Sequence, residues 1–123
     1  MAILNDRVFD NGLTVLDTEV NQIHITSQQA VSFVDATVTS SLGSTATVTI
    51  GAPQDRTGGG RQVVVSAVTD GAVSGTGTAT HYALVDTVNS RLLAAGSLGI
   101  AQSVTSGNTF TLTSVTVGIP DPA

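Results

Sequence analysis

Residues 81–98, HYALVDTVNSRLLAAGSL, form the stretch from which the rest of the fold can be predicted. They predict two consecutive strands, His81–Asp86 and Arg91–Leu98, joined by the polar loop Thr87–Ser90. The segment Ser90–Ala95 also contains good helix formers after a serine able to cap a helix, so a short helix is an alternative there. The glycine that follows and the short connection favour a hairpin.

Both faces of the first predicted strand are apolar. Side chains alternate between the two faces of a strand. Tyr82 and Leu84 therefore point one way, and Ala83 and Val85 point the other. Apolar residues on both faces are typical of a strand that is covered on both sides. We expect His81–Asp86 to lie at the centre of the fold rather than at its edge.

The composition predicts one β-rich domain. At 123 residues the chain has the length of a single domain, enough to bury roughly two-thirds of its unfolded surface. Threonine and valine are its commonest residue types, and their branched side chains suit a pleated sheet. The net charge of −5 argues against nucleic acid as a partner, because that would require a basic patch.

Charged residues make up 11% of the chain, against about 25% in ordinary soluble domains. A soluble monomer usually carries a mixed charged surface, whereas the cores of protein interfaces are depleted of charge. The composition therefore favours an exterior that partner chains cover in part. The alternative is a robust β-domain with a neutral Thr/Ser surface.

Three further features bear on location. Cysteine is absent, which excludes disulfides and thiolate metal sites. Met1–Phe9 lacks the apolar run of a signal peptide. No stretch approaches the roughly 20 apolar residues of a membrane span. We expect synthesis in the cytoplasm and no membrane partner.

The remaining strands are predicted from short apolar or alternating runs between turn residues. They are Leu13–Glu19, Asn21–Thr26, Ala36–Ser40, Thr45–Ile50, Gln62–Thr69 and Thr109–Val117. The predicted turns and loops are Asn11–Gly12, Ser41–Ser44, Gly51–Gly60, Asp70–Gly71, Ala72–Thr78 and Ser106–Asn108. In the last strand the apolar residues change phase, and a bulge at Thr113–Ser114 would keep all of them on the buried side.

About eight short strands separated by turn residues predict an all-β fold, a single-domain antiparallel β-sandwich or barrel. We assign residues 1–12 to an N-terminal arm, residues 13–118 to the β-domain and residues 119–123 to an extended C-terminal tail. Between the predicted strands, three apolar residues are expected to be partly buried in a crossing segment: Val31, Phe33 and Val34.

No constellation of residues predicts a reaction, a metal site or a cofactor. The glycine-rich loops lack the lysine of a phosphate-binding loop, and Gly75–Gly77 lacks the third glycine of the dinucleotide fingerprint. His24 and His81 lie where a strand would show a side chain to solvent or to a neighbouring chain. Asp86 and Arg91 are expected to form a cross-strand ion pair, of little stabilising effect if exposed. We expect a protein that is not an enzyme.

Arg56 and Arg61 frame the glycine run of the first glycine-rich loop. An arginine on a flexible loop is able to make bidentate contacts with a carboxylate of a partner protein. The alternative is that both are solvated loop charges.

Three segments taken together resemble a known kind of protein: NGLTVLDTEVNQIHITSQ (11–28), HYALVDTVNSRLLAAGSL (81–98) and GNTFTLTSVTVGIPDP (107–122). The chain is similar there to small, Thr-rich structural proteins of tailed-bacteriophage virions, of the head decoration (cement) type. The resemblance implies a β-rich protein on the capsid surface of a virion, often a homotrimer. It also implies the major capsid protein as partner and no enzymatic activity.

The termini and the glycine-rich loop are the predicted contact segments. Extended termini are able to add a strand to a neighbour's sheet through main-chain hydrogen bonds, with little demand on sequence. The candidate interface residues are Ile3, Leu4, Arg7 and Phe9 of the arm, Arg56 and Arg61 of the loop, and Ile119 and Pro120 of the tail.

A second function stays open. Phage tail, neck and fibre proteins share much of this composition, so the alternative is such a component acting as a receptor- or carbohydrate-binding β-module. Sugar-binding modules normally expose aromatic side chains, and aromatic residues make up only 3% of this chain.

Overall fold

The computed structural model describes residues 3–4, 12–57 and 60–119, and most of them lie in strands. In chain order the elements are β1 (Ile3–Leu4), α2 (Thr14–Glu19), β2 (Gln22–Thr26), η1 (Asp35–Thr39, a π-helical turn), β3 (Ser41–Thr45), β4 (Gln54–Asp55), β5 (Arg61–Val65), β6 (Val68–Val73), β7 (Gly77–Asp86), β8 (Arg91–Val104), β9 (Thr109–Leu112) and β10 (Val115–Ile119).

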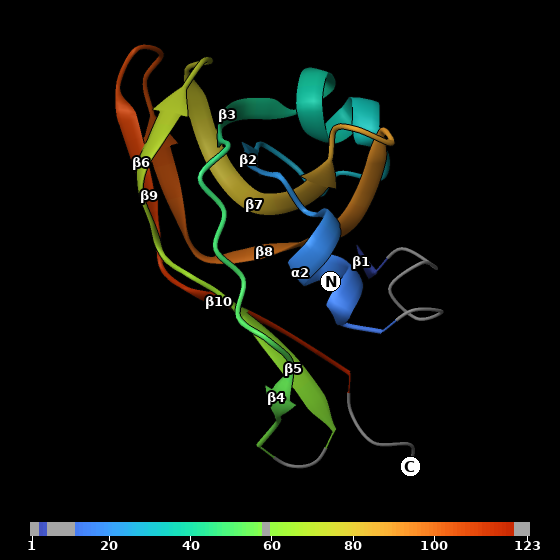
Figure 1. Ribbon diagram of the computed structural model, residues 1–123. Coiled ribbons are helices and arrows are strands. Elements are labelled where there is room, and N and C mark those ends of the chain that lie inside the picture. The colour runs from blue at the N-terminus through green and yellow to red at the C-terminus, as the bar shows by residue number, and fades with distance from the viewer. Residues whose placement is uncertain (1–2, 5–11, 58–59, 120–123) are drawn as a thin grey trace.

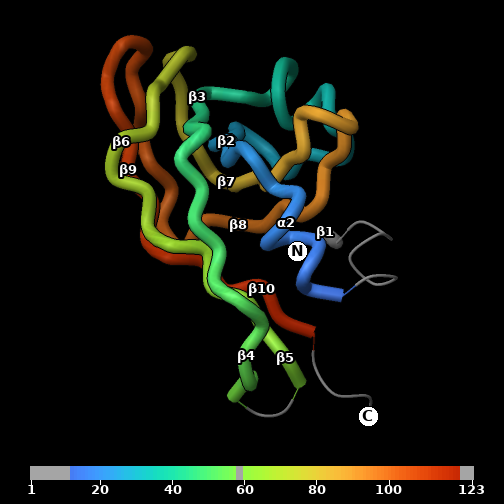
Figure 2. The backbone as a smooth tube through the Cα atoms, viewed as in Figure 1, coloured from blue at the N-terminus to red at the C-terminus, as the bar shows by residue number. Residues whose placement is uncertain are grey.

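These strands form two antiparallel sheets (Figure 1). The larger sheet has seven strands in the order β1-β8-β7-β2-β3-β6-β9, and the smaller has three in the order β10-β5-β4. The larger sheet curls round on itself, which the tube of Figure 2 follows clearly, and the smaller sheet projects from one end. The prediction of an all-β sandwich or barrel is confirmed.

The β7–β8 hairpin lies within the larger sheet, with β1 beyond β8 and β2 beyond β7. Its register pairs run from Asp86 opposite Arg91 at the turn to Gly77 opposite Val104 at the far end. Both strands are therefore longer than predicted. Arg91–Ala95 is extended, so the helix alternative for this segment is wrong.

The two faces of β7 contribute to two separate cores, as the alternation predicts. Tyr82 and Leu84 belong to the larger core, inside the curl of the sheet. Ala83 and Val85 belong to a smaller core on the opposite face. The smaller core consists mainly of alanine, and its buried residues are Ala30, Ala36, Ala83, Val85, Leu92 and Ala95.

A buried carboxylate organises the turn between β7 and β8. Asp86 is only 2% exposed, and its Oδ1 accepts hydrogen bonds from the backbone N–H groups of Val88 (2.9 Å) and Asn89 (3.3 Å). Its Oδ2 accepts one from the Asn89 amide at 2.8 Å. Burial alone would raise the pKa of Asp86, but these hydrogen bonds and the charge of Arg91 outweigh it, so the pKa is lowered. The ion pair of Arg91 is made with Glu19, 3.5 Å away, so the expectation of a simple Asp86–Arg91 pair is wrong.

We expect Asp86→Ala to lower the free energy of unfolding by about 1–3 kcal/mol, because it removes the charged acceptor of the hydrogen bonds that hold the turn. Urea unfolding at pH 7 would measure the change. Asp55→Ala is the control: its carboxylate is 95% exposed, so the loss is at most about 1 kcal/mol. Since the pKa of Asp86 is lowered, its contribution is present above the unfolded pKa of about 3.9 and is lost as the pH falls further.

Leu13–Glu19 was predicted as a strand, and this prediction is wrong, because Thr14–Glu19 is the helix α2. The apolar residues Leu13, Leu16 and Val20 are spaced three and four apart and all contact the larger core. Val15 is buried as well, which is why the run also suits an alternating pattern. Contact with the core decides in favour of the helix.

The segment from Ala36 to Ile50 is displaced along the chain relative to the prediction. Ala36–Ser40 lies mostly in η1 rather than in a strand, and Ser41–Thr45, predicted largely as a turn, is β3. Beyond Thr45 the predicted strand does not form, apart from an isolated bridge between Ile50 and Val65. The Thr45 hydroxyl accepts a hydrogen bond from the Thr47 N–H. Such a bond between a threonine side chain and the nearby backbone competes with the hydrogen bonds of a strand ladder.

The predicted Asp70–Gly71 turn instead lies inside β6, at a register shift against β9. Glycine is required there because a Cβ at position 71 would collide with the buried ring of Phe110. The ring therefore packs directly on the backbone of the neighbouring strand, and the sheet bends beneath it.

We expect Gly71→Ala to lower the free energy of unfolding by about 1–3 kcal/mol, the usual range for an overpacked core. Gly99→Ala is the matched control, since a Cβ at that position meets no atom within 4 Å. Thermal unfolding followed by circular dichroism would compare the two. Equal stability of the two variants would contradict the close packing of Phe110 on β6.

The chain changes sheets where a bulge was predicted. Thr113 and Ser114 separate β9 of the larger sheet from β10 of the smaller one. Phe110, Leu112 and Val117 are buried, and Val115 packs against the same core while remaining partly exposed. The break is thus at the predicted residues, but it divides two strands rather than bending one.

Candidate functional site

One hydrogen-bonded group of polar side chains was missed by the sequence analysis. His24 Nδ1 lies 2.9 Å from Ser41 Oγ, and His24 Nε2 lies 2.9 Å from Gln22 Oε1. A carbonyl oxygen only accepts, so Nε2 carries the hydrogen and Nδ1 accepts the hydroxyl proton of Ser41. His24 is 6% exposed, so its expected position facing solvent or a neighbouring chain is wrong.

This Ser41–His24–Gln22 group has the order of a nucleophile, a base and an orienting residue. Its chemistry is nevertheless that of a buried polar network, because both ring nitrogens are engaged and the ring is closed to a substrate. Gln22 and His24 lie two apart on one face of β2, a spacing visible in the sequence. Ser41 joins them only through the pairing of β2 with β3, so no local signal predicts it. His81, on β7, is partly exposed and lies 2.7 Å from the hydroxyl of Thr80.

We expect the protein to lose stability as the pH falls below about 6.5, the pKa of an unfolded histidine. Burial lowers the pKa of His24 in the folded state, so protons bind more readily to the unfolded chain. His24→Gln should flatten the fall in melting temperature between pH 7.5 and pH 5. The pKa of His81 is also lowered by burial, so His81→Gln is the comparison variant. An unchanged pH profile in His24→Gln would contradict the buried, neutral imidazole.

Arg56 and Arg61 lie near the projecting end of the smaller sheet. Arg61 Nη1 donates to Asp55 Oδ1 at 2.7 Å, and Arg61 Nη2 donates to the Pro53 carbonyl at 3.0 Å. The Arg56 side chain lies over Gly118 of β10, where a Cβ would meet its Cδ at 3.0 Å. The glycine-rich loop thus contains the short strand β4, and both arginines make contacts within the chain. Their contact with a partner stays a prediction.

The predicted contact segments at the termini are described only in part. Ile3 and Leu4 form β1, which pairs with Ala95 and Ala94 of β8 in the chain's own sheet. Ile119 ends β10 opposite Arg61. Arg7, Phe9 and Pro120 lie outside the described residues. Among the described members of the predicted interface, Arg61 and Ile119 are therefore neighbours, whereas β1 lies on the other sheet.

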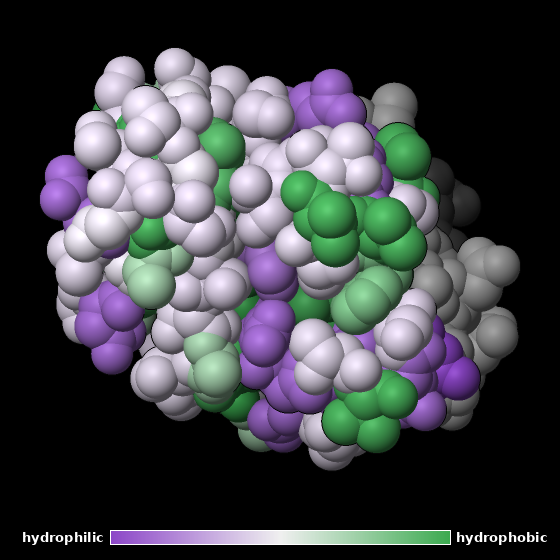
Figure 3. Space-filling model, turned by 90° about the horizontal axis from the view of Figure 1, so that it is seen from above, coloured by the Kyte–Doolittle hydropathy of each residue, from purple (hydrophilic) through white to green (hydrophobic). Residues whose placement is uncertain are grey.

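Four of the five exposed large hydrophobic residues in the described part of the chain are valines, which we call the valine patch: Val31, Val34, Val38 and Val88. Their side chains are 60–81% exposed. Val34 and Val38 lie four apart in the helical segment of residues 33–39 that includes η1, Val31 lies two residues before that segment, and Val88 lies in the β7–β8 loop. These two segments lie side by side in Figure 1, and Figure 3, seen from that end, shows several groups of apolar residues with polar residues between them.

The valine patch corrects the prediction for this segment. Of the three residues expected to be partly buried, Phe33 packs against the smaller core, whereas Val31 and Val34 point outward. Together the four valines expose on the order of 400 Å² of apolar surface, comparable in total to the largest apolar patch of a typical monomer. Asp35 is the one charge between residues 27 and 40. Its carboxylate accepts hydrogen bonds from the Ser40 hydroxyl and the Val31 N–H, and these lower its pKa.

No protein-family model, curated protein or solved structure matches this chain. Among the described residues, no group of three or more histidine, aspartate or glutamate side chains is arranged to hold a metal ion. In the same part of the chain, no helix has the length and apolar character that crossing a membrane requires.

Proposed function

We propose that this chain is a structural virion protein of the decoration (cement) type, which binds the outside of a tailed-phage capsid and stabilises it. Its partners are the major capsid protein and further copies of the chain, with a homotrimer favoured. The valine patch is the observation that carries the proposal, because a chain with few charges also exposes four large apolar side chains on one face.

The apolar character and the size of the valine patch support a role in protein contact. Exposed valine is costly in water and favourable against another protein, at roughly 25 cal/mol per Å² of apolar surface removed from water. A patch of about 400 Å² is smaller than the roughly 800 Å² per partner of a stable interface. It suits one contact among many on a repeating shell, where modest contacts act together.

The described aromatic side chains do not favour the sugar-binding alternative. Tyr82 and Phe110 are buried, at 8% and 3% exposed, and Phe33 packs against the smaller core. Stacking on a sugar requires an open ring face. The part of the chain that the structure describes thus offers no aromatic platform.

The test first looks for a major capsid gene beside the coding sequence, and then uses capsids assembled from that capsid protein and purified without this chain. We expect the protein to cosediment with these shells and to raise their melting temperature. Val34→Glu/Val38→Glu should weaken binding by at least about tenfold, because burying a charge opposes the contact.

Ile100→Glu is the matched control, since Ile100 is also exposed, at 82%, but lies on β8 away from the valine patch. It should bind shells like the unmodified protein. No binding to shells, or no capsid gene beside the coding sequence, would overturn the cement proposal. Equal binding by both variants would remove the valine patch from it.

A further inference from the structure

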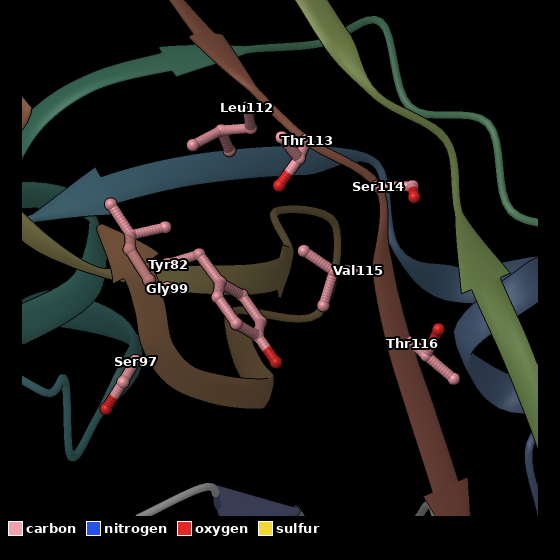
Figure 4. A pocket seen from close by; sticks show the side chains of 9 residues that line it. Tyr82, Ser97, Gly99, Leu112, Thr113, Ser114, Val115 and Thr116 are labelled. Carbon is pink, nitrogen blue, oxygen red and sulfur yellow. The ribbon is translucent and has the colours of Figure 1, made fainter. Parts of the chain in front are cut away.

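A hollow of about 350 Å³ opens between β8 and the crossing from β9 to β10 (Figure 4). It is lined by Tyr82, Ser97, Leu98, Gly99, Leu112, Thr113, Ser114, Val115 and Thr116. In Figure 4 the ring of Tyr82 lies between the wall formed by β8 and the wall formed by residues 112–116. The volume lies near the lower end of the range for sites that take small ligands or a few residues of a chain.

Strand edges that have no ladder partner among the described residues meet at this hollow, where the register of β8 against β7 also shifts between Ser97 and Gln102. β9 ends the larger sheet, and β10 ends the smaller one. β8 pairs with β1 only at Ala94 and Ala95, so among the described residues its outer edge has no strand beside it from Ser97 onward. Thr113 and Ser114 belong to neither sheet. Edges of this kind present N–H and C=O groups that a further strand is able to pair with.

One side chain bridges β8 and β9 beside the hollow. At one end, the side-chain amide of Gln102 on β8 donates to the carbonyl of Thr111 on β9 at 2.9 Å. A backbone ladder would bring two strands to about 4.8 Å, and no ladder joins β8 and β9 among the described residues. The two strands are therefore joined there by a side-chain hydrogen bond rather than by a ladder.

The lining defines the chemistry of the occupant. Serine, threonine and tyrosine hydroxyls alternate with leucine and valine, and no charged residue lines the hollow. An uncharged occupant fits such a surface, because a charge would lose its hydration without gaining a partner. Tyr82 is only 8% exposed, which leaves too little of the ring open for a sugar to stack on.

We propose that the hollow receives an extended, uncharged segment of another polypeptide, which adds as a strand between the outer edge of β8 and the crossing from β9 to β10. Main-chain hydrogen bonds to both walls would provide the affinity, and alternating hydroxyl and small apolar side chains would fit the lining. The inference concerns a different face from the valine patch and does not depend on the identity of a capsid.

Tyr82 makes the hollow directly observable. It is the only tyrosine, and the chain has no tryptophan, so the intrinsic tyrosine fluorescence of the protein reports on this hollow alone. The probe is the blocked peptide Ser-Thr-Ala-Thr-Val-Thr-Ile, a copy of residues 44–50, which is uncharged, alternates in the required way and has no aromatic residue. We expect a saturable change in fluorescence, together with amide shifts of Ser97–Gly99 and Thr113–Thr116 in NMR spectra.

A matched pair of variants separates backbone from side-chain recognition. Ser114→Pro removes an N–H group at an exposed residue outside both ladders, and should weaken peptide binding about tenfold. Ser114→Ala keeps that N–H group and should bind within about twofold of the unmodified protein. Because a proline could also disturb the chain, Ser97→Phe is the second variant: it fills the hollow from an exposed position and should abolish binding while the melting temperature is kept.

Three outcomes would overturn the proposal. One is the absence of any Tyr82 response to the peptide at millimolar concentration. Another is unchanged binding by both Ser114→Pro and Ser97→Phe. The third is a response to galactose or glucose but not to the peptide, which would assign the hollow to a glycan. Failure of capsid binding would leave this test unaffected, so the two proposals can fail separately.

Discussion

The pairing of β7 with β8 is the interaction on which the rest of the structure depends. Because Tyr82 and Leu84 face one way while Ala83 and Val85 face the other, the pair is stable only if both of its faces are covered. The curl of the larger sheet and α2 cover one face. A short helical segment around η1 covers the other face. The outer side of this segment is exposed and contributes to the valine patch.

Close approach of aromatic rings to backbone allows the curl. Phe110 lies on Gly71 of β6, and Tyr82 lies opposite Gly96 of β8, where a Cβ would meet its hydroxyl oxygen at 2.7 Å. The two rings fill the interior of a sheet that does not close. Its free edges consequently come near each other without pairing, and the hollow at Tyr82 is the space that remains.

Two surfaces of different kinds follow from this arrangement. The valine patch offers apolar area, which suits a broad and modest contact. The hollow offers unpaired backbone, which suits a specific extended segment. Both are poor in charge, as is the chain as a whole, in keeping with a protein that is covered in part by its neighbours. Neither surface includes Arg56 or Arg61, which make their contacts within the smaller sheet.

The sequence by itself determined the all-β class and the β7–β8 hairpin, because alternation and a turn are properties of consecutive residues. Only the tertiary structure decided whether Leu13–Glu19 became a helix and whether Thr45–Ile50 paired with another strand. The alternating apolar residues of both segments are compatible with a strand when the segments are considered alone. The same holds for function. His24 contacts Ser41, and Val34 remains exposed, because of the elements that the fold places beside each of them. The neighbouring residues in the sequence do not indicate which elements those are.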